Sequence, residues 1–190
     1  MKIGVLILAA GYSQRMGENK ALLKFNTDFT FLDQLISQYQ NAGINEIKVI
    51  IQHERLPVHP ALLSKDDIQF IRNGLPQLGR SYSIHKGLQE FKSFDFIFIQ
   101  NIDNPFTSSD LIKQMVLESR KNAVIIPKVE NKSSHPILLA QQFILQILNQ
   151  NAQSFDFRET FSLFPKHYIS WENKNIRANI NTTEEYKDWF

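Results

Sequence analysis

The chain has 190 residues, of which 43% are hydrophobic and 21% charged, a composition typical of one globular domain whose core needs no disulfide. It contains no cysteine, which excludes disulfides, thiolate zinc sites, iron–sulfur clusters and a cysteine nucleophile. The net charge is only +2, and the basic residues do not cluster in the sequence. Nothing therefore indicates binding to nucleic acid.

The first predicted element is a strand over Lys2–Ala10. A lysine followed by an apolar run of eight residues, Ile3–Ala10, also resembles the start of an export signal. The run is much shorter than the roughly 20 residues that cross a bilayer, and a fully buried strand has the same pattern. We favour the strand and expect no membrane partner. The absence of cysteine fits the cytoplasm as the expected location.

Further strands are predicted where short runs rich in Ile, Val and Phe recur. These runs are Glu46–Gln52, Ile68–Ile71, Phe94–Gln100, Ala123–Pro127, Pro136–Ala140 and His167–Trp171. Between them, apolar residues recur at helical spacing in Phe31–Ala42, Ile84–Phe91, Leu111–Val116 and Phe143–Leu148. This alternation predicts an α/β fold with a mostly parallel sheet and helices on both faces.

The loop after the first strand carries the clearest indication of chemistry. Open α/β sheets bind ligands where loops leave the carboxyl ends of their strands. Gly11 and Gly17 let backbone amides approach an anion, and Arg15 and Lys20 add positive charge. We therefore predict that the loop holds a polyphosphate. Its spacing matches neither a Walker A loop nor GxGxxG, which argues against the usual ATPase and dinucleotide sites.

This loop resembles the signature of the MobA-like nucleotidyltransferases, a family that includes the molybdenum cofactor cytidylyl- and guanylyltransferases. The matching residues are Leu8, Ala9, Ala10, Gly11, Ser13, Arg15, Met16, Gly17, Lys20, Leu22 and Leu23. The resemblance implies a Rossmann-like three-layer α/β/α sandwich of the nucleotide-diphospho-sugar transferase type. One nucleotidyltransferase domain would then span residues 1–190.

The same resemblance implies transfer of a nucleotidyl group from a nucleoside triphosphate to a phosphorylated acceptor, with release of pyrophosphate. In such proteins the loop wraps the triphosphate. The resemblance therefore makes Arg15 and Lys20 candidate catalytic residues. The candidate nucleotide-binding residues of the loop are Leu8, Ala9, Ala10, Gly11, Ser13 and Gly17.

A second segment, from Asn73 to Leu88, resembles the base-recognising segment of the cytidylyltransferases. Without the resemblance, its serines are expected to cap a helix. With it, Asn73, Gly79 and Ser83 become candidates for nucleotide binding, and Ser83 is expected at the cytosine edge.

Asp103 follows a strongly apolar predicted strand and precedes Pro105. A carboxylate there can hold Mg²⁺, although an aspartate also favours the turn that Pro105 requires. The Asp-x-Pro spacing resembles the family's metal site, which implies Mg²⁺ as cofactor and a catalytic role for Asp103. Asn179 and Asn181 match positions near the metal in relatives. Many cytidylyl relatives have aspartate there, so direct coordination by these weaker amide ligands stays open.

His135 lies in Ser134-His135-Pro136, which resembles the family's Gly-His-Pro segment on the acceptor side. The alternative is a loop residue fixed by its proline. The acceptor itself is expected to be a molybdopterin-type cofactor. Alternatives are a cytidylyl- or uridylyltransferase acting on a small sugar, polyol or alcohol phosphate, and a nucleotide-binding regulator without turnover.

Two features favour CTP as the donor. Guanylyl members of the family tend to carry Ala-Gly-Gly where this chain has Ala9-Ala10-Gly11, and the added Cβ at position 10 narrows the base pocket. The resemblance of the Ser83 segment favours the same base. The oligomeric state is left open.

Overall fold

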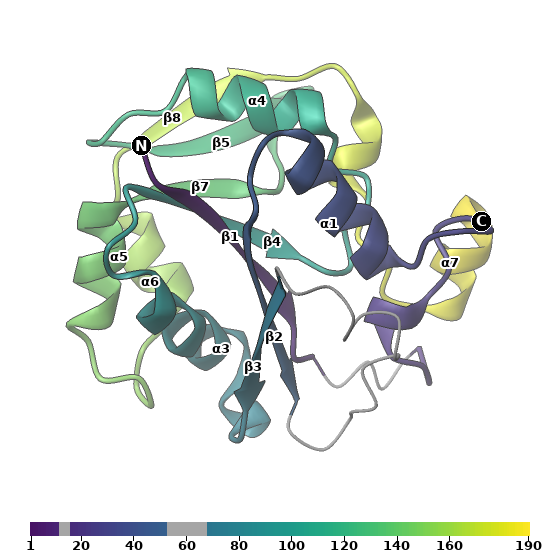
Figure 1. The fold of residues 1–190 in the computed structure, drawn as a ribbon, viewed down its shortest axis with the longest axis horizontal. Coiled ribbons are helices and arrows are strands. Elements are labelled where there is room, and N and C mark those ends of the chain that lie inside the picture. Colours follow the sequence, from purple (N-terminus) through teal and green to yellow (C-terminus); the bar gives the residue numbers. More distant parts are fainter. Residues whose placement is uncertain (12–15, 53–67) are drawn as a thin grey trace.

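The computed structural model describes residues 1–11, 16–52 and 68–190. In these ranges an eight-stranded sheet lies between two layers of helices (Figure 1). The strands are β1 (Ile3–Ala9), β2 (Glu46–Gln52), β3 (Ile68–Asn73), β4 (Phe96–Asn101), β5 (Val124–Val129), β6 (Lys132–Ser133), β7 (Ile137–Ala140) and β8 (Lys166–Ser170). The α/β/α sandwich expected from the sequence is confirmed.

The sheet order is β3-β2-β1-β4-β7-β5-β6, with β8 on β5. β1 pairs in parallel with both β2 and β4, while β7 is antiparallel to β4 and to β5. The sheet is therefore mixed but mostly parallel. The chain goes to one side of β1 for β2 and to the other side for β4. The carboxyl ends of β1 and β4 thus form the kind of switch point where open sheets bind ligands.

The α-helices of the described residues are α1 (Phe31–Asn41), α3 (Gly79–Leu88), α4 (Ser109–Leu117), α5 (Gln141–Leu148), α6 (Phe157–Ser162) and α7 (Thr183–Trp189). Contacts join α1 to α4, and α3 to α5 and α6, so the two groups cover opposite faces of the sheet (Figure 1). Short 3-10 helices precede α1 at η1 (Lys20–Leu22), flank α3 at η2 (Pro76–Leu78) and η3 (Gln89–Phe91), and precede α7 at η4 (Lys174–Arg177). None of the helices in the described ranges is long and apolar enough to cross a membrane.

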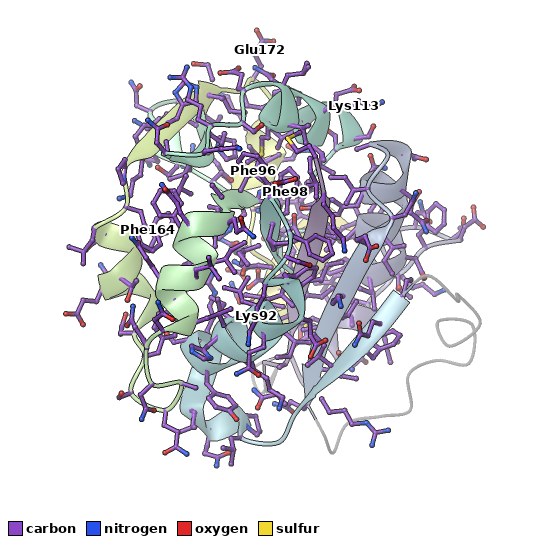
Figure 2. All side chains as sticks on the ribbon, turned by 60° about the vertical axis from the view of Figure 1, so that its left-hand side comes forward. Lys92, Phe96, Phe98, Lys113, Phe164 and Glu172 are labelled. Carbon is purple, nitrogen blue, oxygen red and sulfur yellow. The ribbon has the colours of Figure 1, made fainter. Side chains whose placement is uncertain are left out.

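The central strands are buried on both faces, as their unbroken apolar sequences predict. Phe96 and Phe98 of β4 lie inside the sandwich, whereas Lys113 and Glu172 project from its outer surface (Figure 2). At Gly87 in α3, an added Cβ would lie 2.4 Å from a methyl carbon of Leu6 in β1. The glycine thus allows α3 to lie against β1, which brings the start of the helix to the end of the strand.

All seven predicted strands are present, although the fourth begins at Phe96 and β3 extends to Asn73. The sequence did not predict β6, a two-residue strand that returns from β5 through Glu130 and Asn131 at positive φ. It also did not predict α6, whose six residues are too few to display a helical period.

Candidate active site

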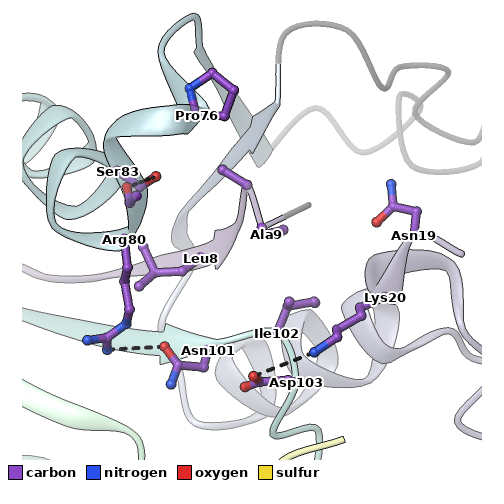
Figure 3. A pocket seen from close by; sticks show the side chains of 13 residues that line it. Leu8, Ala9, Asn19, Lys20, Pro76, Arg80, Ser83, Asn101, Ile102 and Asp103 are labelled. Carbon is purple, nitrogen blue, oxygen red and sulfur yellow. Dashed lines mark hydrogen bonds and ion pairs between the residues drawn. The ribbon is translucent and has the colours of Figure 1, made fainter. Parts of the chain in front are cut away.

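The described residues form a cavity of about 250 Å³ at the carboxyl ends of β1 and β4 (Figure 3). It lies at the switch point of the sheet. Its lining comes from the end of β1 and the residues after it, the start of η1, the start of η2, the start of α3, and the end of β4 with the turn that follows. The lining residues are Leu8, Ala9, Ala10, Gly11, Asn19, Lys20, Pro76, Gly79, Arg80, Ser83, Asn101, Ile102 and Asp103.

The wall opposite η1 is the first turn of α3. Leu78 precedes the helix without a side-chain cap from the described residues, and Gly79 has a φ of 77°. Amides of an uncapped first turn are donors for an anion or a polar ligand. Ser83 accepts a hydrogen bond at 2.9 Å from Asn73, which is itself fully buried. Ser83 lines the cavity, whereas Asn73 does not line it and instead donates to the Ser83 hydroxyl.

The opposite wall brings Lys20 close to Asp103. Asn19 caps η1 by accepting a hydrogen bond from the Ala21 amide, and Lys20 opens that helix. The Lys20 ammonium donates to Asn181 Oδ1 at 2.7 Å and lies 3.8 Å from Asp103 Oδ2. Asn181 belongs to the segment before α7, so residues 161 positions apart in the chain meet at one ammonium group.

The environment of Asp103 acts on its pKa in opposite directions. Burial raises the pKa and is the largest effect, while the charges of Lys20 and Arg80 lower it. The net direction is upward. Asp103 Oδ1 is buried and has no hydrogen-bond partner among the described residues.

These oxygens fit a divalent cation that is shared with a substrate. Mg²⁺ is usually held by one or two carboxylates together with substrate phosphates and waters. The vacant Oδ1 of Asp103 and the amide oxygen of Asn181 match this donor type. No group of three or more His, Cys, Asp or Glu in the described ranges could hold a metal by itself. The protein ligands are thus too few for a closed cage.

Arg80 lines the cavity, although no role was predicted for it from the sequence. Its guanidinium donates to Asn101 Oδ1 at 3.2 Å (Figure 3) and lies 5.3 Å from the centroid of the Phe157 ring. Burial lowers its pKa, and the charge of Asp103 opposes that shift. Two sequence signals identify the missed residues: Arg80 is in the first turn of the helix that carries Ser83, and Asn101 ends the strand that leads to Asp103.

Of the other predicted site residues, those that the structure describes do not line the cavity. Ser13 and Arg15 fall outside the described residues. Gly17 is exposed, and Asn179 is exposed with its backbone oxygen accepting a hydrogen bond from Asn181. His135 does not line the cavity, but it is close enough to Arg80 for that charge to affect it.

His135 is held as a neutral imidazole. Burial, followed by the charge of Arg80, lowers its pKa to about 4. The folded state resists protonation of His135, while the unfolded state accepts a proton near pH 6.5. The contribution of the neutral His135 to folding stability is therefore complete above pH 6.5 and is lost as the pH falls towards 4.

We therefore expect wild type to lose about 1–2 kcal/mol more stability than His135→Gln between pH 7 and pH 5. Urea unfolding of both proteins at the two pH values measures this difference. An equal loss in both proteins would contradict the buried, neutral state of His135.

Comparison with known proteins identifies relatives of the whole chain. A family model described as the MobA-like NTP transferase domain matches residues 5–161. A protein named probable molybdenum cofactor guanylyltransferase, from Bacillus cytotoxicus, is 27% identical over 96% of this chain and 94% of its own length. The molybdenum cofactor cytidylyltransferase of Escherichia coli is 22% identical over 97% of this chain and 93% of its own.

Solved structures share the fold. A structure described as a nucleotidyl transferase from Methanothermobacter superimposes with a TM-score of 0.79 at 20% identity, covering 98% of this chain and 95% of the other. The arrangement of sheet and helices therefore recurs in a protein with few identical residues.

Proposed function

The chain belongs to the MobA-like NTP transferase family, and we propose that it moves CMP from CTP to a phosphorylated acceptor of the molybdopterin type, releasing pyrophosphate. The observation that carries this proposal is the cavity at the ends of β1 and β4. There Lys20 and Asp103 face the backbone of Ala9–Gly11 and the first turn of α3.

The proposed reaction is an in-line displacement. A phosphate oxygen of the acceptor attacks the α-phosphorus of the nucleotide, the new P–O bond forms, and the bond to pyrophosphate breaks. The acceptor oxygen is already ionised, so no general base is required. Catalysis then depends on positioning and on compensation of negative charge.

The residues of the cavity have distinct parts in this scheme. Lys20 carries a positive charge at the phosphates, and backbone amides of the glycine-containing loop donate to them. Arg15, by the family resemblance, adds a second cation. Asp103 would hold Mg²⁺ with help from Asn181, and the ion would supply further charge neutralisation at the phosphates. Arg80 lines the cavity and its charge reaches His135, so this cation would suit an anionic acceptor.

Ala10 supports a pyrimidine base. It is buried and lines the same cavity as Ser83, so its methyl group would leave less room for a purine than a glycine at this position. The alternative is guanylyl transfer, which the name of the Bacillus relative favours. Acceptors such as sugar, polyol or alcohol phosphates are the second alternative, and a regulator that binds nucleotide without turnover is the third.

A pyrophosphate-release screen tests these possibilities. Four nucleoside triphosphates are combined with Mg²⁺ and a set of phosphorylated acceptors, including a molybdopterin-type cofactor. We expect release with CTP and the cofactor. Binding of CTP without release from any acceptor would instead support the regulator.

The base assignment predicts a shift in specificity for Ala10→Gly. Removing the methyl group should raise kcat/KM for GTP relative to CTP by about tenfold, since one methyl group in a pocket is worth about 1–3 kcal/mol. Ala42→Gly, at the carboxyl end of α1, is the matched control and should leave the ratio unchanged. An unchanged ratio in Ala10→Gly would contradict a role for Ala10 in base selection.

A further inference from the structure

Gln100, the penultimate residue of β4, is fully buried and has no part in the scheme above. Its side-chain amide makes four hydrogen bonds. The oxygen Oε1 accepts from the hydroxyl of Tyr39 at 3.1 Å and from that of Thr107 at 2.9 Å. The nitrogen Nε2 donates to the backbone oxygens of Asn101 at 2.9 Å and Asn104 at 3.0 Å. An amide has two donors and two strong acceptor sites, so every one of them is used.

The network determines the orientation of this amide. Both hydroxyls must donate, because the Gln100 atom that faces them accepts. Burial raises the pKa of Tyr39, so its phenol keeps the proton that it donates. The two backbone carbonyls can only accept, so Nε2 must face them, and rotating the amide by half a turn would set Oε1 against both carbonyl oxygens, acceptor against acceptor. Such a buried and fully satisfied network is rigid.

The two carbonyls that Gln100 binds are the ends of one turn. Asn101 and Asn104 flank Ile102 and Asp103, and the Asn104 amide closes the turn onto the Asn101 oxygen at 3.3 Å. Two further backbone bonds hold the middle of the turn: Ile102 donates to Leu8 of β1, and Ile180 donates to the Asp103 oxygen at 2.7 Å. Gln100 therefore links α1 and the segment after β4 to the backbone that carries the Asp103 carboxylate.

We propose that Gln100 is a positioning residue that holds the Asp103 carboxylate in the cavity by clamping the ends of the Asn101–Asn104 turn. This inference rests on the proposed function of Asp103. The clamp acts through the backbone, since Gln100 does not line the cavity.

The first test uses Gln100→Met, which keeps an unbranched side chain of similar length and removes all four hydrogen bonds. Without metal or nucleotide, we expect amide hydrogen exchange in the Asn101–Asn104 turn to become at least about tenfold faster. With substrates, we expect the half-saturating Mg²⁺ concentration for pyrophosphate release to rise about 10- to 100-fold, the range found when outer-shell partners of metal ligands are removed.

Two further variants separate positioning from loss of stability. Ile144→Ala in α5 removes a fully buried side chain that does not line the cavity, and it should destabilise the protein without changing either readout. Thr107→Val removes one of the two donors to Gln100 Oε1 and keeps the clamp, so we expect the same changes as in Gln100→Met but smaller. If Gln100→Met fails to fold, Thr107→Val carries the test.

Two results would overturn the proposal. One is an amide hydrogen exchange rate in the Asn101–Asn104 turn of Gln100→Met that equals the wild-type rate. If Gln100→Met does not fold, the same result in Thr107→Val would overturn it. The other is a rise in half-saturating Mg²⁺ for Ile144→Ala as large as for Gln100→Met. If wild type released no pyrophosphate with any acceptor, the proposed function would fail. The exchange measurement would still decide whether Gln100 clamps the turn.

Discussion

Replacement of Lys20 by alanine is expected to lower kcat/KM for pyrophosphate release by about 10²- to 10³-fold, the usual cost of removing one group that stabilises transition-state charge. The Lys20 ammonium is the described cation nearest to Asp103, at 3.8 Å, and only 12% of its side chain is exposed. Its removal leaves negative charge on both the phosphates and Asp103 without that compensation.

The loss in Lys20→Ala should not come from unfolding. Lys20 lies in a three-residue 3-10 helix at the edge of the cavity, where its ammonium donates to Asn181 and pairs with Asp103. Lys24→Ala is the matched control, because it removes the same charge four residues later in the chain. Lys24 is exposed and does not line the cavity. Full pyrophosphate release by Lys20→Ala would show that the triphosphate binds elsewhere.

The second large effect is expected for Asp103→Asn, which keeps the shape of the side chain and removes its charge. We expect pyrophosphate release to fall about 10³-fold because a neutral amide is a weaker ligand for Mg²⁺. Asp28→Asn, in an exposed loop outside the cavity, is the control for the change of one charge. Activity equal to wild type in Asp103→Asn would remove the metal role of this residue.

The raised pKa of Asp103 gives this variant a second signature. Burial favours the protonated carboxyl, so activity should fall as the pH drops through a pKa above the ordinary aspartate range, and this acid limb should be absent from the residual activity of Asp103→Asn. A carboxyl with a raised folded-state pKa contributes stability at low pH that is lost as the pH rises through that pKa. Asp103→Asn should therefore be at least as stable as wild type at pH 7 in urea unfolding. Lower stability at pH 7 would contradict the direction of the shift.

Local sequence patterns predicted the elements of the fold because their cause is local. An unbroken apolar run such as that of β1 or β4 is buried on both faces wherever it lies in the sheet. The direction of β7 could not be predicted in this way. Its sequence, Ile137–Ala140, is uniformly apolar and reads the same for a parallel and an antiparallel strand.

The cavity was only partly predictable for a similar reason. Gly11, Lys20 and Asp103 follow strands in the sequence, so the rule that ligands bind at the carboxyl ends of strands was enough to select them. Arg80 and Asn101 carry no motif and gain their place only because β4 lies beside β1 and α3 lies against β1. Asn73 shows the opposite case: the family resemblance predicted a ligand contact, and in the fold its side chain is buried and donates to Ser83.

By itself, the sequence determined which segments are strands and helices, which loop is the candidate for binding phosphates and which family the chain resembles. These properties depend on residues close together in the chain. The tertiary structure alone decided that Lys20 meets Asn181 and that Tyr39 and Gln100 share a buried hydrogen bond across 61 positions. A buried polar group that finds no partner loses its hydrogen bonds to water, so each member of such a pair needs the other. Whether the two meet depends on how the packed elements align, and no local pattern of residues encodes that alignment.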